Sequence, residues 1–351
     1  MPRRPTSSAC SARWRSLRTG GVVLAAALTA GLATAATAEP QVYRATGFGA
    51  ASAFWSDARG LVMRNDGGAY FRVSLTDGRL DVAPLPSFPP PLARDRPDML
   101  PDGIVTEGRG EIAAAWLTGP TDRYRHAVLG DAIEASGLGV TLADGRTLHF
   151  RLPSDSVFED RLARLADVDG DGDHELVVVR SYLDAGAALA VLDLVDDALR
   201  IVAEAPAIGT PNRWLNPVGV ADFDGDGRPE AAVVITPHIG GVLTFYRMQN
   251  GRLRRVAAEP GFSNHALDSP ELGMSAVLDA DGDRVPDIAL PDAARGSLRI
   301  VSFAGGRVRS LMRLDLPAKI VTAIVAADLD GQPGLELAYG LADDSLMVVK
   351  P

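Results

Sequence analysis

One acidic motif occurs four times in the 351-residue sequence, at nearly regular spacing. The copies read "ADVDGDGDHELVVVR" at 166–180, "ADFDGDGRPEAAVVI" at 221–235, "LDADGDRVPDIALPD" at 278–292 and "ADLDGQPGLELAYG" at 327–340. The first aspartates of successive copies are 55, 57 and 49 residues apart. Self-similarity at about 50 residues is typical of propellers and solenoids, so the repeat restricts the fold more than any other feature of the chain.

Each period has the pattern of four short strands. In the second period, two apolar runs are separated by Asn250-Gly251, which is a tight hairpin signal. Four strands joined by turns form one blade of a β-propeller. Helical periodicity is nearly absent, and "FEDRLARLA" at 158–166 is the one arguable helical stretch. We therefore expect an all-β protein, a β-propeller built from four-stranded antiparallel sheets.

Counting the periods predicts six blades, with seven as the alternative. Before residue 160 the repeat lacks most of its aspartates and keeps the rhythm of strands. The predicted blades cover 48–90, 102–152, 160–205, 214–258, 272–314 and 320–351. The last window holds only about three strands, so "QVYRATG" at 41–47 is a candidate for its missing outer strand. We expect residues 39–351 to form a single propeller domain, with calcium-loop repeats clearest from 160 to 345.

Each copy of the motif places oxygen ligands where a calcium loop needs them. Counted from the first aspartate, carboxylates occupy alternate places and the ninth place, and a glycine at the sixth place turns the backbone. Ca²⁺ takes six to eight oxygens, and the seventh place would contribute its backbone carbonyl. The predicted ligands are Asp167, Asp169, Asp171, Asp173 and Glu175; Asp222, Asp224, Asp226, Arg228 and Glu230; Asp279, Asp281, Asp283, Val285 and Asp287; and Asp328, Asp330 and Glu336.

The four copies are not equivalent, so the sequence predicts two to four Ca²⁺ ions. The third copy has Arg284 in place of the turn glycine, and the fourth has Gln332 and Pro333 at the fifth and sixth places. An EF-hand does not fit, because apolar residues occupy the place of its bidentate glutamate and Pro217 disfavours an entering helix. Without that glutamate we expect weak affinities, on the order of 10⁻⁴ to 10⁻³ M.

The first 38 residues have the pattern of a secretory signal peptide. Five arginines precede an apolar stretch that begins at Val22, and Ala36-Thr37-Ala38 supplies a cleavage site. Cleavage removes these arginines and no acids, so the formal net charge changes from −10 to −10 − 5 = −15, which opposes nucleic acid as a partner. The only cysteine, Cys10, is removed as well. We expect a periplasmic or extracellular protein with no membrane span after cleavage.

The acidic motifs quoted above resemble the FG-GAP/VCBS repeats found in the β-propeller of integrin α chains and in many exported bacterial proteins. The resemblance covers 160–345 clearly, and 45–150 by the rhythm of strands alone. It implies Ca²⁺ in the hairpin between the first and second strands of a blade. It implies no single activity, because this fold hosts adhesion modules, lectins and enzyme domains.

The sequence contains none of the common catalytic motifs that we sought, and the mature chain has no cysteine nucleophile. We therefore expect a non-enzymatic binding or scaffold module for a protein or glycan partner. The alternative is a glycan lyase or hydrolase that uses the central face of the propeller. Loops on the face away from the calcium loops mix aromatic, cationic and amide groups, which suit recognition. The predicted binding residues are Arg180, Tyr182, Arg213, Trp214, Asn216, His238 and His265.

Overall fold

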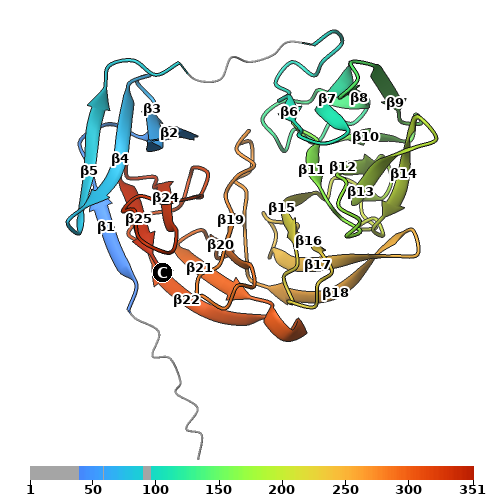
Figure 1. The fold of residues 1–351 in the computed structure, drawn as a ribbon. Coiled ribbons are helices and arrows are strands. Elements are labelled where there is room, and N and C mark those ends of the chain that lie inside the picture. The colour runs from blue at the N-terminus through green and yellow to red at the C-terminus, as the bar shows by residue number, and fades with distance from the viewer. Residues whose placement is uncertain (1–38, 58, 90–95) are drawn as a thin grey trace, which may run out of the picture. The chain divides into compact units, whose positions relative to one another are not determined.

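All strand pairs in the part of the chain that the structure describes are antiparallel. The computed structural model describes residues 39–57, 59–89 and 96–351, and the predicted signal peptide lies outside these ranges. They contain 25 strands, and in the described ranges the one helical segment is a short 3₁₀ turn, η1 (Ala304–Gly306). The strands form four four-stranded sheets and one nine-stranded sheet (Figure 1). No described helix has the length and apolar composition needed to cross a membrane.

Three of the four-stranded sheets are meanders in chain order. They consist of β2 (Ala51–Asp57), β3 (Gly60–Asn65), β4 (Tyr70–Thr76) and β5 (Arg79–Leu85); of β15 (Leu215–Ala221), β16 (Glu230–Ile235), β17 (Val242–Gln249) and β18 (Arg252–Pro260); and of β19 (Ala276–Leu278), β20 (Asp287–Pro291), β21 (Ser297–Ser302) and β22 (Arg309–Asp315). In each meander every strand pairs with its predecessor, as short connections between antiparallel strands require. The prediction of four-stranded antiparallel sheets is thus confirmed.

The remaining four-stranded sheet joins the two ends of the described chain. It consists of β23 (Val325–Ala327), β24 (Glu336–Gly340), β25 (Leu346–Lys350) and β1 (Gln41–Ala45). The pairing of β1 with β25 runs from Gln41 opposite Lys350 to Ala45 opposite Leu346, and Figure 1 shows the blue strand beside the red one. The expectation that 41–47 supplies the missing outer strand of the last repeat is confirmed.

The nine-stranded sheet contains two meanders that a short extra strand joins. Its strands are β6 (Thr106–Glu107), β7 (Ile112–Thr121), β8 (Glu134–Leu142), β9 (Thr147–Arg151), β10 (Ser156–Phe158), β11 (Arg164–Ala166), β12 (Glu175–Tyr182), β13 (Gly186–Val195) and β14 (Ala198–Glu204). Strands β6–β9 and β11–β14 are the meanders, and β10 pairs with both β8 and β12. The stretch 158–166 is therefore extended rather than helical, because Phe158 and Ala163 are buried between the two meanders.

Neighbouring meanders pack face to face through five hydrophobic cores. In β12, Leu176 and Val178 belong to the core shared with β7 and β8, whereas Val177 and Val179 belong to the core shared with β16. Because successive residues of a strand point to opposite faces, a strand between two cores is apolar at every position. This explains the unbroken apolar runs that follow the acidic motifs. The other three cores continue the series from β16 to β20, from β20 to β24, and from β24 to β3.

Candidate metal centres

All four acidic loops connect the first strand of a meander to its second strand. Loop 1 (167–175), loop 2 (222–230), loop 3 (279–287) and loop 4 (328–336) follow β11, β15, β19 and β23, respectively. The ninth residue of each loop is also the first residue of the following strand. This placement agrees with the position of the calcium hairpin that the family resemblance implies.

The first aspartate of each loop holds the turn by accepting backbone hydrogen bonds. In loop 1, Asp167 Oδ1 accepts from Gly170 N at 2.6 Å, and Oδ2 accepts from Gly172 N at 3.1 Å. Loops 2 and 3 repeat both bonds, whereas loop 4 keeps only the first, because Pro333 has no N–H. The fourth place is glycine in every loop, with φ between 71° and 85°, a left-handed conformation that favours glycine. This glycine was not part of the predicted calcium-loop pattern.

The ninth-place carboxylate is the most buried part of each loop. Glu175 is 3% exposed, and Glu230, Asp287 and Glu336 are fully buried. Each accepts a hydrogen bond from the backbone N–H of the second place, at 2.7 to 3.0 Å. These bonds fix one carboxylate oxygen against the loop backbone.

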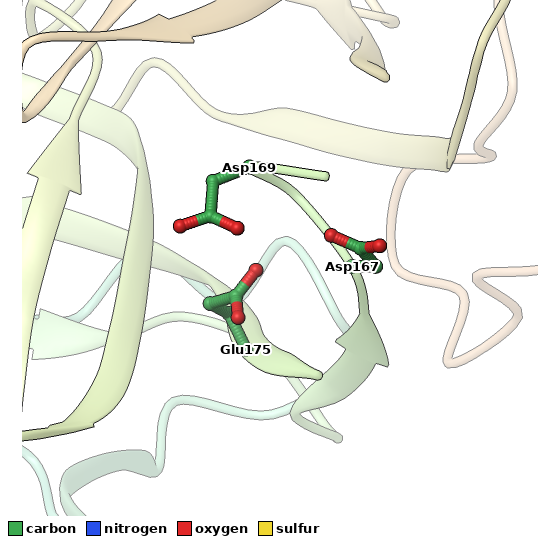
Figure 2. A group of neighbouring side chains, drawn as sticks. All are labelled: Asp167, Asp169 and Glu175. Atoms are coloured by element: carbon green, nitrogen blue, oxygen red, sulfur yellow. The ribbon is translucent and has the colours of Figure 1, made fainter. Parts of the chain in front are cut away.

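Each loop gathers three carboxylates into a cluster that could hold a metal ion. One oxygen from each of the first, third and ninth places lies within 4.8 Å of the other two, and Figure 2 shows this arrangement for Asp167, Asp169 and Glu175. Burial and the neighbouring carboxylates raise the pKa of Glu175 to about 7, and burial likewise raises the pKa of Asp287 to about 6. A bound cation would relieve this repulsion, because an opposite charge favours the ionised form.

A hydrogen bond joins the fifth and seventh places in loops 1, 2 and 3. Asp171, Asp226 and Asp283 each accept a hydrogen bond from the seventh-place N–H, at 2.8 to 3.0 Å. The side chains of Asp173 and Arg228 are exposed at the seventh place, and Val285 is half-buried there. Side-chain exposure does not test ligation by the seventh-place carbonyls, so this ligation stays a prediction. In loop 3, Arg284 takes the left-handed conformation of the missing glycine, with φ 70°.

Three residues that the sequence analysis missed lie beside these clusters. Arg247 of β17 forms ion pairs with Asp224, Asp226 and Glu230 of loop 2, and Lys350 of β25 pairs with Asp330 and Glu336 of loop 4. Asp193 of β13 is close enough to loop 1 to raise the pKa of Glu175. All three lie on the third strand of a meander, far from the loops in the sequence, so the motif alone contains no signal for them.

Three of the predicted binding residues come together at the strand ends opposite the loops. Ring centroids are 4.7 Å apart for Trp214 and His265, 5.0 Å for the two histidines, and 6.1 Å for the stacked pair Trp214 and His238. His265 Nε2 donates to the carbonyl of Ser269 at 2.8 Å, so its Nδ1 accepts from His238 Nε2 at 2.8 Å. Burial lowers the pKa of His238 to about 4 and that of His265 to about 3.

The other four predicted binding residues make contacts outside that group of three rings. Arg180 stacks over the ring of Tyr182 at 4.3 Å, and both contact the carboxylate of Glu204. Arg213 donates to the carbonyl of its neighbour Asn212 at 3.0 Å. Asn216 is fully buried, and its amide donates to two backbone carbonyls, those of Asn264 and Leu272. The binding role of the seven residues stays a prediction.

A buried polar cluster adjoins Trp214. Its indole N–H donates to the backbone carbonyl of Glu159 at 2.9 Å. The carboxylate of Glu159, itself fully buried, contacts His126 Nδ1 at 2.6 Å and accepts from the hydroxyl of Ser181. Burial and nearby carboxylates, Glu159 foremost among them, raise the pKa of Glu134 to about 9.

These observations define an all-β protein with a repeated acidic loop, and the comparisons name the repeat. Residues 167–233, which contain loops 1 and 2, match the family model of the FG-GAP-like repeat. This part of the chain is similar to an FG-GAP-like repeat, as the motifs of loops 1 and 2 predicted. No curated protein matches the sequence.

Among solved structures, the chain is similar to Rhamnogalacturonan Lyase PL11 of Bacillus licheniformis and to the exotype rhamnogalacturonan lyase YesX. Identity is 16% in both cases, with TM-scores of 0.43 and 0.40 and 86% of this chain covered. The chain spans 59% and 66% of the lengths of the two proteins.

The expectation that the chain is not an enzyme is corrected by this comparison. Both solved structures are of lyases, so the comparison gives no support to a non-enzymatic protein. We withdraw that expectation. At these TM-scores and identities the likeness assigns no reaction to this chain.

Proposed function

We propose that this protein is an exported, calcium-binding β-propeller of six blades that binds a protein or glycan partner. The observation that carries the proposal is the fourfold repetition of one loop geometry. In every loop the same backbone hydrogen bonds hold three carboxylates within 4.8 Å of one another. Such a set of hard oxygen donors on a tight turn suits Ca²⁺.

The packing of the meanders supports six blades. Counting the nine-stranded sheet as two meanders, and β1 with β23–β25, gives six four-stranded units. The five hydrophobic cores join these units in chain order, as the side-by-side packing of propeller blades requires. The meander β2–β5 would then close the ring against β6–β9.

Calcium binding is tested by calorimetric titration of the chain that begins at residue 39. We expect saturable heat with a dissociation constant on the order of 10⁻⁴ to 10⁻³ M. Asp169→Ala removes one carboxylate of loop 1 and should lower the number of bound ions by one. Asp81→Ala is a matched control, because this residue lies on β5, outside the four loops. Absence of binding heat in the wild type would refute the calcium part of the proposal.

The strand ends opposite the calcium loops are the proposed binding face. Trp214 and His265 are buried, and the half-buried side chains of Tyr182, Arg213 and His238 at these strand ends support this location, because aromatic and polar groups together form many recognition sites. A pull-down from the native envelope fraction with the immobilised chain tests it. His238→Ala and Tyr182→Phe should reduce recovery of the partner, whereas Arg228→Ala on the loop side should not. Equal recovery with all variants would place the partner elsewhere.

Glycan cleavage is a second candidate function, favoured by the polar cluster around Glu159. A carboxyl group whose pKa is raised to about 9, such as that of Glu134, keeps its proton at neutral pH and can act as a general acid. Incubation with a panel of acidic and neutral polysaccharides, followed by chain-length analysis, tests this candidate. Glu134→Gln and His126→Ala should abolish any cleavage. Cleavage that survives both substitutions would exclude this cluster as the site.

A further inference from the structure

One position on the third strand of each meander lies directly beside the ninth-place carboxylate. The register pairs Leu176 with Leu192, Ala231 with Tyr246, Ile288 with Val301 and Leu337 with Val349. One residue further along each strand pair, the ninth-place carboxylates face the residues Asp193, Arg247, Ser302 and Lys350. Opposite residues in neighbouring antiparallel strands share one face of the sheet, so this third-strand position borders the acidic cluster in all four repeats.

In loop 2 the third-strand residue is a cation that already occupies the cluster. Arg247 Nε donates to Glu230 Oε1 at 2.7 Å, and its two terminal nitrogens donate to Asp226 at 2.9 Å and Asp224 at 2.7 Å. The Arg247 side chain is only 11% exposed. A planar guanidinium with five donors satisfies three carboxylates at once and neutralises part of their charge.

Loop 4 repeats this arrangement with a lysine. The Lys350 ammonium donates to Asp330 Oδ2 and lies 3.1 Å from Glu336 Oε1. Two of the three carboxylates in this cluster are therefore already paired with a cation. The third, Asp328, still accepts the N–H of Gly331 at 2.7 Å.

Loops 1 and 3 have oxygen-bearing side chains at the same position instead of a cation. Asp193 adds a fourth carboxylate beside the three that cluster in loop 1, and Ser302 places a hydroxyl beside loop 3. Among the described residues, the buried Oδ1 atom of Asp287 in loop 3 has no hydrogen-bond partner; Oε1 of Glu336 in loop 4 has none either, but the Lys350 ammonium lies 3.1 Å from it. A buried carboxylate oxygen without a partner is costly, and a cation is the ligand that its charge demands.

We propose that the third-strand residue selects which loops bind metal, so that Arg247 and Lys350 replace the ion in loops 2 and 4 and Ca²⁺ binds only loops 1 and 3. This inference rests on the calcium binding proposed above. A Ca²⁺ ion needs its oxygens at about 2.3 to 2.6 Å, and the guanidinium holds those same oxygens. Placing both cations in one cluster would bring like charges into contact, which is unfavourable at short range.

Direct counting of bound calcium tests the selection. Equilibrium dialysis of the chain from residue 39 with radioactive Ca²⁺ at saturation should give two ions per chain. Arg247→Ser copies the residue found at loop 3 and should bind three ions. Arg255→Ser is the matched control, because this arginine is exposed on the neighbouring strand β18, and it should stay at two. Circular dichroism checks that the variants are folded.

The reverse substitution keeps the test decisive if Arg247→Ser does not fold. Asp193→Arg places a cation beside loop 1 and should lower the count from two ions to one. Three or four ions in the wild type, or an unchanged count in both variants, would overturn the selection while calcium binding itself stands. A wild-type chain that binds no ion would refute the proposed function instead.

Discussion

At the scale of single residues, backbone N–H groups hold the acidic loops in shape by donating hydrogen bonds to the loop carboxylates. The first aspartate closes the turn, and the ninth-place carboxylate fixes the second residue of the loop. The fourth place needs a left-handed backbone in all four loops, and loop 3 needs one at Arg284 as well. An arginine in that conformation is strained, because its Cβ crowds the backbone.

Replacing Arg284 by glycine should stabilise the protein. Glycine adopts a φ near 70° without strain, so we expect the free energy of unfolding to rise by ~0.5–1 kcal/mol in saturating Ca²⁺. Urea denaturation measures the change. Arg307→Gly is the matched control, since Arg307 is exposed and extended at φ −136°, and glycine there should destabilise by a similar amount. A less stable Arg284→Gly variant would show that the conformation carries no strain.

The paired histidines predict a loss of stability in acid. Burial lowers the pKa of His238 to about 4 and of His265 to about 3, while both titrate near 6.5 in the unfolded chain. Between pH 6.5 and about 3 the unfolded state binds more protons, so stability falls as the pH falls through this window. Arg295 adds to the lowering of both pKa values, and Asp268 opposes it at His238.

His238→Gln tests the histidine pair without removing its hydrogen bond. The glutamine amide can still donate to His265 Nδ1, but it does not titrate. Stability measured from pH 7 to pH 4 should therefore fall less steeply than in the wild type. His149→Gln, an exposed histidine, should leave the slope unchanged. Identical slopes for wild type and His238→Gln would exclude this residue as a source of acid sensitivity.

At the scale of elements, each meander combines a loop-bearing hairpin with a third strand that completes the cluster. The aspartate spacing predicted where the loops lie and which strands they join, because those residues are contiguous. It did not predict Arg247, which lies 17 residues after Glu230 and reaches it only through the pairing of β16 with β17. Strand register, which a single sequence does not encode locally, decides such contacts. The same limit hid β10, whose three residues join two predicted repeats.

Strand β1 should stabilise the last meander. Tyr43 packs against the core between β24 and β3, and β1 covers the edge of β25. A chain that begins at residue 47 should lose roughly 2 kcal/mol or more of unfolding free energy, the scale of one buried large side chain. Denaturant unfolding measures this, with a chain that begins at Gln41 as the control. Equal stability of the two chains would mean that the pairing contributes little.

At the scale of the whole molecule, apolar cores join the six meanders, and four of these meanders carry an acidic loop. The apolar runs in the sequence predicted the cores, because a strand buried on both faces has no polar positions. The carboxylates within a loop repel one another. Together with burial, this repulsion raises the pKa values of Glu175 and Asp287. In the proposed function, Ca²⁺ removes that repulsion and stabilises the folded chain by binding it alone.

Thermal unfolding with and without calcium tests this account most directly. A site at a hundred times its dissociation constant adds about 2.7 kcal/mol of stability, and each kcal/mol shifts the midpoint by ~2 °C for a chain of this size. We predict that the midpoint of the chain from residue 39 rises by several degrees in excess Ca²⁺ relative to a chelator, and that Asp169→Ala reduces the shift. Coincident unfolding curves in Ca²⁺ and chelator would contradict the assignment of the acidic loops as calcium sites.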